Sequence, residues 1–310
     1  QRLWKTHVYT ALERRLDRWT AFNTPGEDTS VPMQVLAEGQ YVRPADGIHR
    51  LARDHFRGNL IRLCRAAAEK KVAVVLIVPV SNLADQPPLA SLNADGSLLE
   101  DTQAILALAE LHLAGKFENL LNETERRIDL NRNAAIWHYY HGIALAGLGR
   151  PESAADEFLS ARELDALHFR ACEEMMKVIE TLNRDDDFPQ ELNIIVADPR
   201  PDFRPKSLPR DRSPVFFYEH VHPTFFGNAM LAWNAVKAVE SILGLKTSAP
   251  PFPDPFYAGR IVQFPVDRER AGRNIGTLVN GWPFAGRPEM AHIRAFASRE
   301  QRVGRAEMDS

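Results

Sequence analysis

Residues 72–80 read VAVVLIVPV and form the longest apolar run in the chain. A helix needs about 20 residues to span a bilayer, so this run is too short for that role. Its short length and β-branched content are typical of a strand that is covered on both faces. An amphipathic helix precedes it directly, because Phe56, Leu60, Leu63 and Ala67 recur at helical spacing. A helix that leads at once into a buried strand is half of a βαβ unit and predicts a parallel sheet.

A second strand is expected at residues 193–198, NIIVAD, and a later amphipathic helix includes Met230 and Trp233. The first strand is followed by the polar loop SNLAD, residues 81–85. In open α/β sheets, ligands bind at the carboxyl ends of the strands. Asn82 in that loop is therefore a candidate substrate-binding residue, although its side chain could equally shape the loop. Asp198, at the end of the second strand, is expected to form a loop or cap a helix.

Between the two strands, residues 98–183 show only helix signals and an internal period. The segments Gly115-Lys116-Phe117 and Gly149-Arg150-Pro151 lie 34 residues apart, which is the length of a tetratricopeptide repeat. In the second copy, Gly142 allows two helices to approach, and the facing helix supplies Ala154, Phe158 and Ala161. Two units are fewer than the roughly three that such arrays need to stand alone. We therefore expect an insertion packed against the α/β body and closed by the helix over residues 169–182.

These patterns divide the chain into four segments. We expect residues 1–90 to be the first part of an α/β domain whose earlier strands are missing, and residues 91–190 to be a helical, tetratricopeptide-like insertion. Residues 191–243 are the second part of the α/β domain, and residues 244–310 are a C-terminal extension. The chain begins at Gln1 in a helical pattern, so we expect further sequence upstream. The compartment stays unassigned, with an extracytoplasmic or membrane-anchored location through such a segment as one expectation.

Charge and cysteine content exclude some classes of function. The formal net charge is -3 and the 38 basic residues are scattered, so no nucleic-acid partner is expected. A late basic bias, from Arg260 to Arg305, is interrupted by acidic residues and predicts a solvated surface. The two cysteines, Cys64 and Cys172, cannot form a disulfide framework and are expected to be buried free thiols.

The densest candidate site is FYEHVHPTFFGNAMLA, residues 217–232. An imidazole is the usual general base near neutral pH, and a nearby carboxylate fixes its tautomer and stabilises the imidazolium. Glu219 and His222 are three residues apart, so one tight loop can bring both to the edge of the sheet. Pro223 and Gly227 are expected to shape that loop. The alternative is that the histidines satisfy backbone groups or cap the following helix.

This segment resembles the last conserved block of the GDSL-type, or SGNH, hydrolases, in which an acid and a histidine three residues apart complete a Ser-His-Asp triad. Residues 55–85, HFRGNLIRLCRAAAEKKVAVVLIVPVSNLAD, are similar to a bacterial subgroup that carries tetratricopeptide repeats between this strand and the triad block. The resemblance covers most of residues 50–243. It implies that His222 is the catalytic base and that Glu219 replaces the family's usual Asp.

The same resemblance implies a three-layer α/β sandwich. It also implies an esterase or acyl-transfer reaction through an acyl-enzyme, on a small-molecule or glycan ester, without a metal or an organic cofactor. The family's nucleophile and oxyanion-hole residues lie in N-terminal blocks that we do not find in this sequence. Asp95-Gly96-Ser97-Leu98 shares letters with the family name, but Ser97 and Glu100 have the spacing of a capping box. We therefore expect the nucleophilic serine upstream of Gln1.

Two other functions remain open. His220-Val221-His222 is similar to the metal-binding H-x-H pair of amidohydrolases. That architecture needs most of a (β/α)₈ barrel, typically about 250 residues, after the pair, and fewer than 90 residues follow His222. Alternatively, the chain is a non-catalytic scaffold whose helical repeats bind a protein partner.

Overall fold

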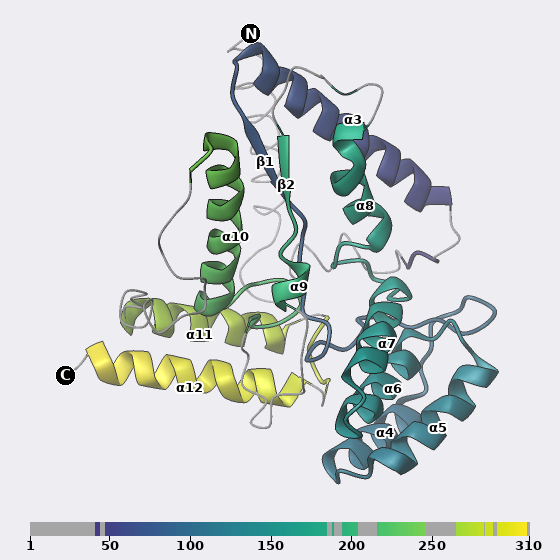
Figure 1. The fold of residues 1–310 in the computed structure, drawn as a ribbon. Coiled ribbons are helices and arrows are strands. Elements are labelled where there is room, and N and C mark those ends of the chain that lie inside the picture. Colours follow the sequence, from purple (N-terminus) through teal and green to yellow (C-terminus); the bar gives the residue numbers. More distant parts are fainter. Residues whose placement is uncertain are drawn as a thin grey trace, which may run out of the picture. The chain divides into compact units, whose positions relative to one another are not determined.

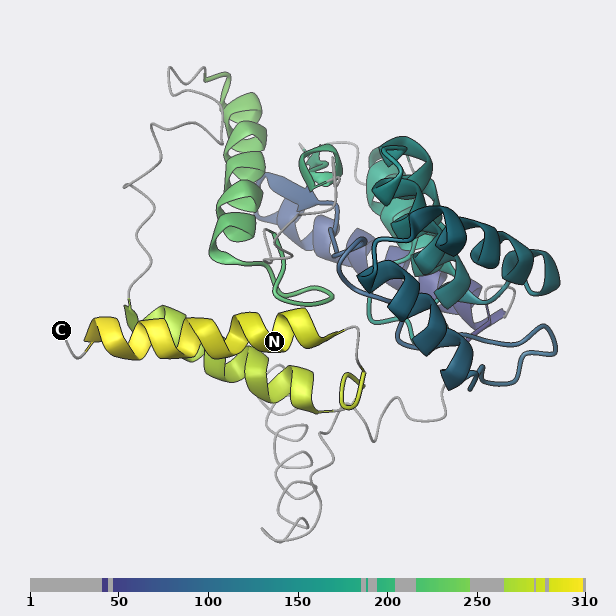
Figure 2. The same ribbon diagram turned by 90° about the horizontal axis from the view of Figure 1, so that it is seen from below.

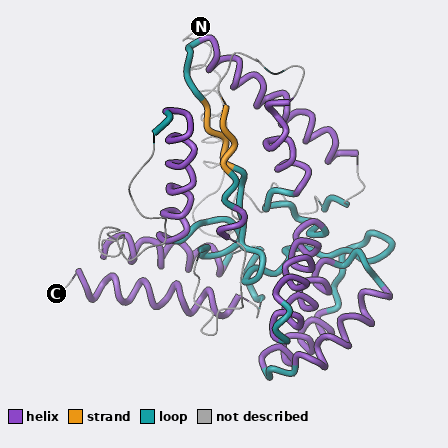
Figure 3. Tube along the Cα trace, viewed as in Figure 1, coloured by secondary structure: helices purple, strands orange, loops and turns teal. Residues whose placement is uncertain are grey.

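The structure, a computed structural model, describes residues 41–43, 47–184, 188, 194–203, 216–245, 265–281, 283–287 and 290–308. These residues are mostly helical, and they contain a small two-stranded parallel sheet (Figure 3). The mixed α/β character and the parallel pairing predicted from the sequence are confirmed. No described helix is long and apolar enough to cross a membrane.

The sheet consists of β1 (Val74–Ile77) and β2 (Ile194–Ala197), with Val74 opposite Ile194. After β1, the Val78 N–H still donates to the Ala197 carbonyl at 2.9 Å. Pro79 then ends the ladder because proline has no N–H to donate. The strand is thus shorter than the apolar run. The prediction that both faces of this strand are buried is wrong at Ile77, which is 37% exposed.

One face of the sheet packs against α3 (Gly47–Glu69) and α8 (Glu173–Thr181), as Figure 1 shows. Helix α3 exists as predicted, but its buried residues are Ile61 and Cys64, whereas Leu63 is 54% exposed. Helix α8 lies within the segment that we expected to close the repeat. Its Met176 and Ile179 instead join Val78 in the core beside the strands. Burial raises the pKa of the Cys64 thiol.

Helix α10 (Phe225–Leu243) contacts both strands and confirms the predicted helix after the second strand. It begins at the N-cap Thr224 and ends at Gly244, whose φ of 62° is left-handed. Its buried residues are Gly227, Met230, Asn234 and Ala238. Val236 and Val239 on the same helix are exposed.

The 34-residue period corresponds to two helical hairpins, α4 (Thr102–Leu113) with α5 (Phe117–Leu130), and α6 (Ala135–Gly147) with α7 (Pro151–Glu163). Gly115 and Gly149 occupy the equivalent turns, with φ of 67° and 75°. These left-handed conformations suit glycine because it has no Cβ.

The predicted packing within the second hairpin is also present. A Cβ on Gly142 would lie 2.8 Å from the Phe158 ring, so only glycine allows this approach. Phe158, Ala154 and Ala161 are all buried in the same cluster. The capping box at Ser97 is wrong, however, because α4 begins after Asp101, whose carboxylate accepts the Ala104 N–H. The Ser97 hydroxyl donates to Asp95 in a separate turn.

The C-terminal extension folds into an antiparallel pair of helices, α11 (Pro265–Asn280) and α12 (Ala291–Met308), which run side by side in Figure 2. Cβ atoms on Gly272 or Gly304 would lie within 2.6 Å of the opposite backbone, so these glycines allow close contact. The late basic residues are not simply solvated. Several pair with the buried carboxylates Glu269 and Glu300, namely Arg268, Arg273, Arg299 and Arg305.

Candidate functional site

The predicted histidine segment forms a tight hairpin that leads into α10. The Tyr218 N–H donates to the His222 carbonyl at 2.9 Å, and the Thr224 N–H donates to the Phe216 carbonyl at 2.8 Å. The Thr224 hydroxyl then accepts the Gly227 N–H and caps the helix. A Cβ on Gly227 would lie 2.1 Å from the Phe216 carbonyl oxygen. Glycine is therefore required where the hairpin folds against the first turn of α10.

Glu219 lies at the centre of this hairpin and is fully buried. One carboxylate oxygen, Oε1, accepts the His222 N–H at 2.8 Å and is also bonded to Nδ1 of the His222 ring. The other, Oε2, accepts the His220 N–H at 2.7 Å and lies against Nδ1 of the His220 ring. A buried charge needs such partners, because it has lost its contact with water. The structure thus brings together Glu219 and His222, as predicted.

The two histidines occupy opposite environments. The His222 side chain is 59% exposed, so its ring can reach a reactant, whereas the His220 side chain is 5% exposed. When His222 Nδ1–H donates to Glu219, Nε2 becomes the basic ring nitrogen. This is the arrangement that general-base catalysis requires. Glu219 fixes the orientation of the His222 ring from the buried side, and the exposed imidazole is the group that can transfer a proton.

His220 is held neutral inside the protein. Burial, together with repulsion from His222 and Arg170, lowers the pKa of His220 to about 3. Its ring lies 5.9 Å from the Phe169 ring and 5.4 Å from the Phe284 ring. His220 therefore contributes packing and a backbone donor to Glu219, and it does not titrate near neutral pH.

Asn82 lies beside the hairpin at the carboxyl end of β1. Its N–H donates to the His220 carbonyl at 2.9 Å, and the residue is buried. Its side-chain oxygen accepts the Asp85 N–H at 3.1 Å, so that oxygen shapes the loop. This corresponds to the structural alternative that the sequence left open. A substrate contact by the amide nitrogen of Asn82 stays a prediction.

A buried arginine that the sequence analysis did not single out organises this loop. The Arg170 guanidinium donates to the carbonyls of Asn82 and Gln86 and pairs with Asp165 at 3.0 Å. Asp165 in turn accepts the N–H groups of Leu89 and Ala90 at 2.9 Å. The available signal was an arginine in the short stretch ALHFRAC, residues 166–172, in which His168 is the only other polar side chain; this favours a paired, buried arginine.

The C-terminal helices also contact the site, which the sequence did not predict. Phe284, in the turn between α11 and α12, is fully buried against His220. The Phe296 ring of α12 lies 5.7 Å from the ring of Tyr218. Arg287 donates to the carbonyls of Pro88 and Leu89 at 2.7 and 2.9 Å. Phe284, Arg287 and Phe296 thus support the histidine hairpin and the loop after β1.

A pocket of about 630 Å³ opens at the carboxyl ends of both strands. Its lining includes Val80, Ser81 and Leu83 after β1, and Asp198, Arg200 and Phe203 after β2. Asp198 accepts the Arg200 N–H at 3.0 Å, so it caps the short helix α9 (Arg200–Phe203), as expected. The edge of the sheet at which we expected a ligand site therefore carries a pocket.

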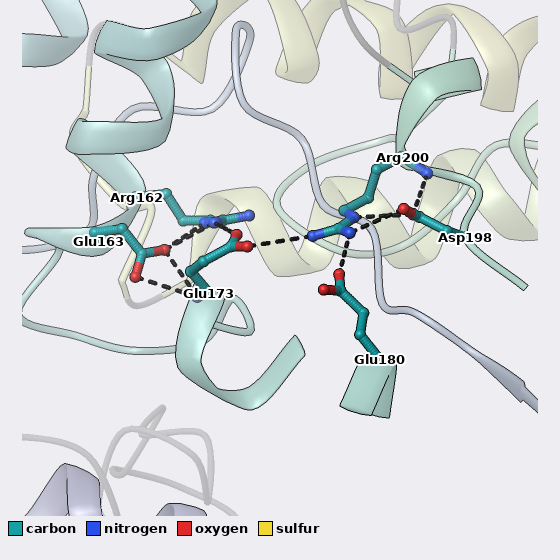
Figure 4. A network of polar contacts seen from close by, with 6 residues as sticks. All are labelled: Arg162, Glu163, Glu173, Glu180, Asp198 and Arg200. Atoms are coloured by element: carbon teal, nitrogen blue, oxygen red, sulfur yellow. Dashed lines mark hydrogen bonds and ion pairs between the residues drawn. The ribbon is translucent and has the colours of Figure 1, made fainter. Parts of the chain in front are cut away.

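A network of ion pairs lines one side of this pocket (Figure 4). Arg162 pairs with Glu163 and Glu173, while Arg200 pairs with Asp198, Glu173 and Glu180. Hydrogen bonds to Asp198 and the surrounding carboxylates raise the pKa of Arg200. Both guanidinium groups are thus bound by carboxylates of the protein itself.

No protein-family model, no curated protein and no solved structure matches this chain. Within the residues that the structure describes, no group of three or more His, Cys, Asp or Glu side chains is arranged to hold a metal ion.

Proposed function

We propose that this protein is an ester hydrolase, or an acyl transferase, of the GDSL (SGNH) type. The single observation that carries the proposal is the pairing of a fully buried Glu219 with Nδ1 of the exposed His222. The loop that follows parallel strand β1 is bonded to the hairpin that carries this pair, because the Asn82 N–H donates to the His220 carbonyl. Residues 217–232 resemble the last conserved block of the family, and residues 55–85 resemble its bacterial subgroup with tetratricopeptide repeats. Both resemblances support the same function, together with a three-layer sandwich and a tetratricopeptide-type insertion.

In the proposed reaction, Nε2 of His222 takes the proton from a serine hydroxyl as that oxygen attacks the ester carbonyl carbon. The proton then passes to the alkoxide that leaves, and an acyl-enzyme remains. A water molecule or an acceptor alcohol attacks the acyl-enzyme in the same way, and its proton passes through His222 to the serine. The proposal places this serine outside residues 1–310. Its substrate is a small-molecule or glycan ester, and the chemistry needs no cofactor.

Glu219 stands where the family usually has Asp, and the hairpin accommodates the longer side chain. Two backbone N–H groups, those of His220 and His222, hold one oxygen each. The carboxylate therefore has one orientation, with Oε1 towards the His222 ring. This geometry supports the role of the acid, which is to fix the tautomer of the histidine and stabilise its imidazolium form.

The test compares His222→Ala with wild type in the complete natural protein, on a panel of carboxylic esters. We expect kcat to fall by roughly 10⁴-fold or more, because removal of a triad member has effects of that size. His55→Ala is the matched control, since His55 is an exposed histidine on α3. It should leave kcat unchanged. Equal activity in a folded His222→Ala protein would overturn the proposal and favour a binding scaffold.

A further inference from the structure

The pocket at the strand ends is lined by no residue of the histidine hairpin, but two of its lining segments are in contact with that hairpin. Ser81 and Leu83 line the pocket, and the N–H of Asn82 between them donates to the His220 carbonyl at 2.9 Å. Phe203 lines the pocket from the β2 side, and its ring lies 4.9 Å from the Phe216 ring and 5.4 Å from the Phe217 ring. Phe216 and Phe217 begin the hairpin that carries Glu219 and His222. The loop of residues 81–83 and Phe203 therefore line the pocket and also contact the hairpin that carries Glu219 and His222.

The lining is mainly apolar and comes from two parts of the chain. The α/β part supplies Val80, Leu83 and Phe203, with two prolines. Helix α7 of the second repeat hairpin supplies Ala155 and Leu159. A volume of about 630 Å³ is within the range of pockets that bind drug-sized ligands, which is roughly 300–1,000 Å³. The repeat therefore forms one wall of a pocket large enough for a chain of several carbon atoms.

The charges at the pocket argue against an anionic occupant. Arg162 and Arg200 are each paired with carboxylates, so the positive charge of both guanidinium groups is balanced within the protein (Figure 4). The two arginines face four carboxylates, those of Glu163, Glu173, Glu180 and Asp198. Of this network, Arg162, Arg200, Glu173 and Asp198 line the pocket, so the lining offers no surplus positive charge to a phosphate or carboxylate group. An uncharged, apolar group is the occupant that this lining fits.

From this juxtaposition we infer that the pocket is the acyl subsite of the proposed hydrolase, and that its substrates carry an apolar acyl chain longer than acetyl. The insertion then acts in substrate selection, through Ala155 and Leu159, rather than only as a surface for a partner. This inference rests on the proposed function, because it names the substrate class of the same site.

The test uses alkyl fluorophosphonates that differ only in chain length, ethyl and octyl, on the complete protein. In the labelling step the serine oxygen forms a bond to phosphorus and fluoride leaves, while the serine proton goes to His222. We expect the octyl probe to label wild type faster than the ethyl probe. Ala155→Phe, which fills the pocket, should lower the octyl-to-ethyl rate ratio by about 10-fold or more, since even a single methylene is worth that much in an apolar pocket.

Two further variants make the outcome decisive. Ser153→Phe places the same bulky ring on the exposed side of α7 and should leave the rate ratio unchanged. Leu159→Ala enlarges the pocket and should raise the ratio, which keeps the proposal testable if Ala155→Phe does not fold. Labelling with the same chain-length preference in all folded variants would overturn the acyl subsite alone. Absence of labelling in folded wild type would overturn the proposed function, and the acyl subsite with it.

Discussion

Replacement of Glu219 by glutamine tests the geometry of the site, because it keeps the size of the side chain and removes its charge. The two carboxylate oxygens accept the N–H groups of His220 and His222 at 2.7 and 2.8 Å. Glutamine has one oxygen, so its NH₂ group must face one of these donors and leave it unsatisfied. An unsatisfied buried group costs about 1–3 kcal/mol. We therefore expect Glu219→Gln to lower the free energy of unfolding by about 1–3 kcal/mol.

The same substitution should have a far larger effect on catalysis. Glutamine no longer fixes Nδ1 of His222 as the protonated nitrogen, and in a serine-protease triad the corresponding acid-to-amide change lowers kcat by about 10⁴-fold. Urea denaturation measures the stability change, with an unchanged m-value as the condition for its interpretation. Ester turnover of the complete protein measures the second effect. Glu174→Gln, at a partly exposed ion pair with Arg53, is the control and should change stability by less than about 0.5 kcal/mol.

Wild-type turnover by Glu219→Gln would refute the role of Glu219 as the acid. Wild-type stability would contradict the buried, fully bonded carboxylate itself. The two readouts are independent, so a stable but inactive variant would retain the catalytic role and reject only the energetic argument.

Three other predictions concern stability. The pKa of His220 is about 3 in the folded protein. The unfolded chain therefore binds a proton below pH 6.5 that the folded one does not, and stability should fall by up to roughly 4 kcal/mol from pH 6.5 to 3; His220→Gln should flatten a pH series of melting curves. Phe158→Ala should cost about 3–5 kcal/mol in urea unfolding, because Phe158 is buried between two repeat helices; a loss below about 1 kcal/mol would contradict this packing. Gly227→Ala should cost about 1–3 kcal/mol or more in thermal unfolding, since its Cβ meets the Phe216 carbonyl, whereas Gly58→Ala in open space should stabilise by about 0.5–1 kcal/mol. Equal melting temperatures for the two alanine variants would refute the close approach.

Local patterns predicted much of the fold. The parallel pairing of β1 and β2 followed from the helix that leads into VAVVLIVPV, and the repeat followed from glycines 34 residues apart. The pairing of Glu219 with His222 followed from their spacing within a turn. Each of these features depends on residues close together in sequence, or on a period.

The errors have long-range causes. Leu63 fits the helical period of α3 but is exposed. The face of α3 that packs into the core carries Ile61 and Cys64 instead. The role of the C-terminal helices depended on contacts such as Phe284 with His220, which no local pattern reveals. The pocket combines α7 with the ends of two strands, so it too appears only in the folded chain.

The most direct test of the central claim is fluorophosphonate labelling of the complete natural protein, with the modified residue located by mass spectrometry. The account predicts labelling of a single serine outside residues 1–310, and loss of that labelling in a folded His222→Ala protein. Absence of labelling in folded wild type, or labelling that persists unchanged without His222, would contradict it.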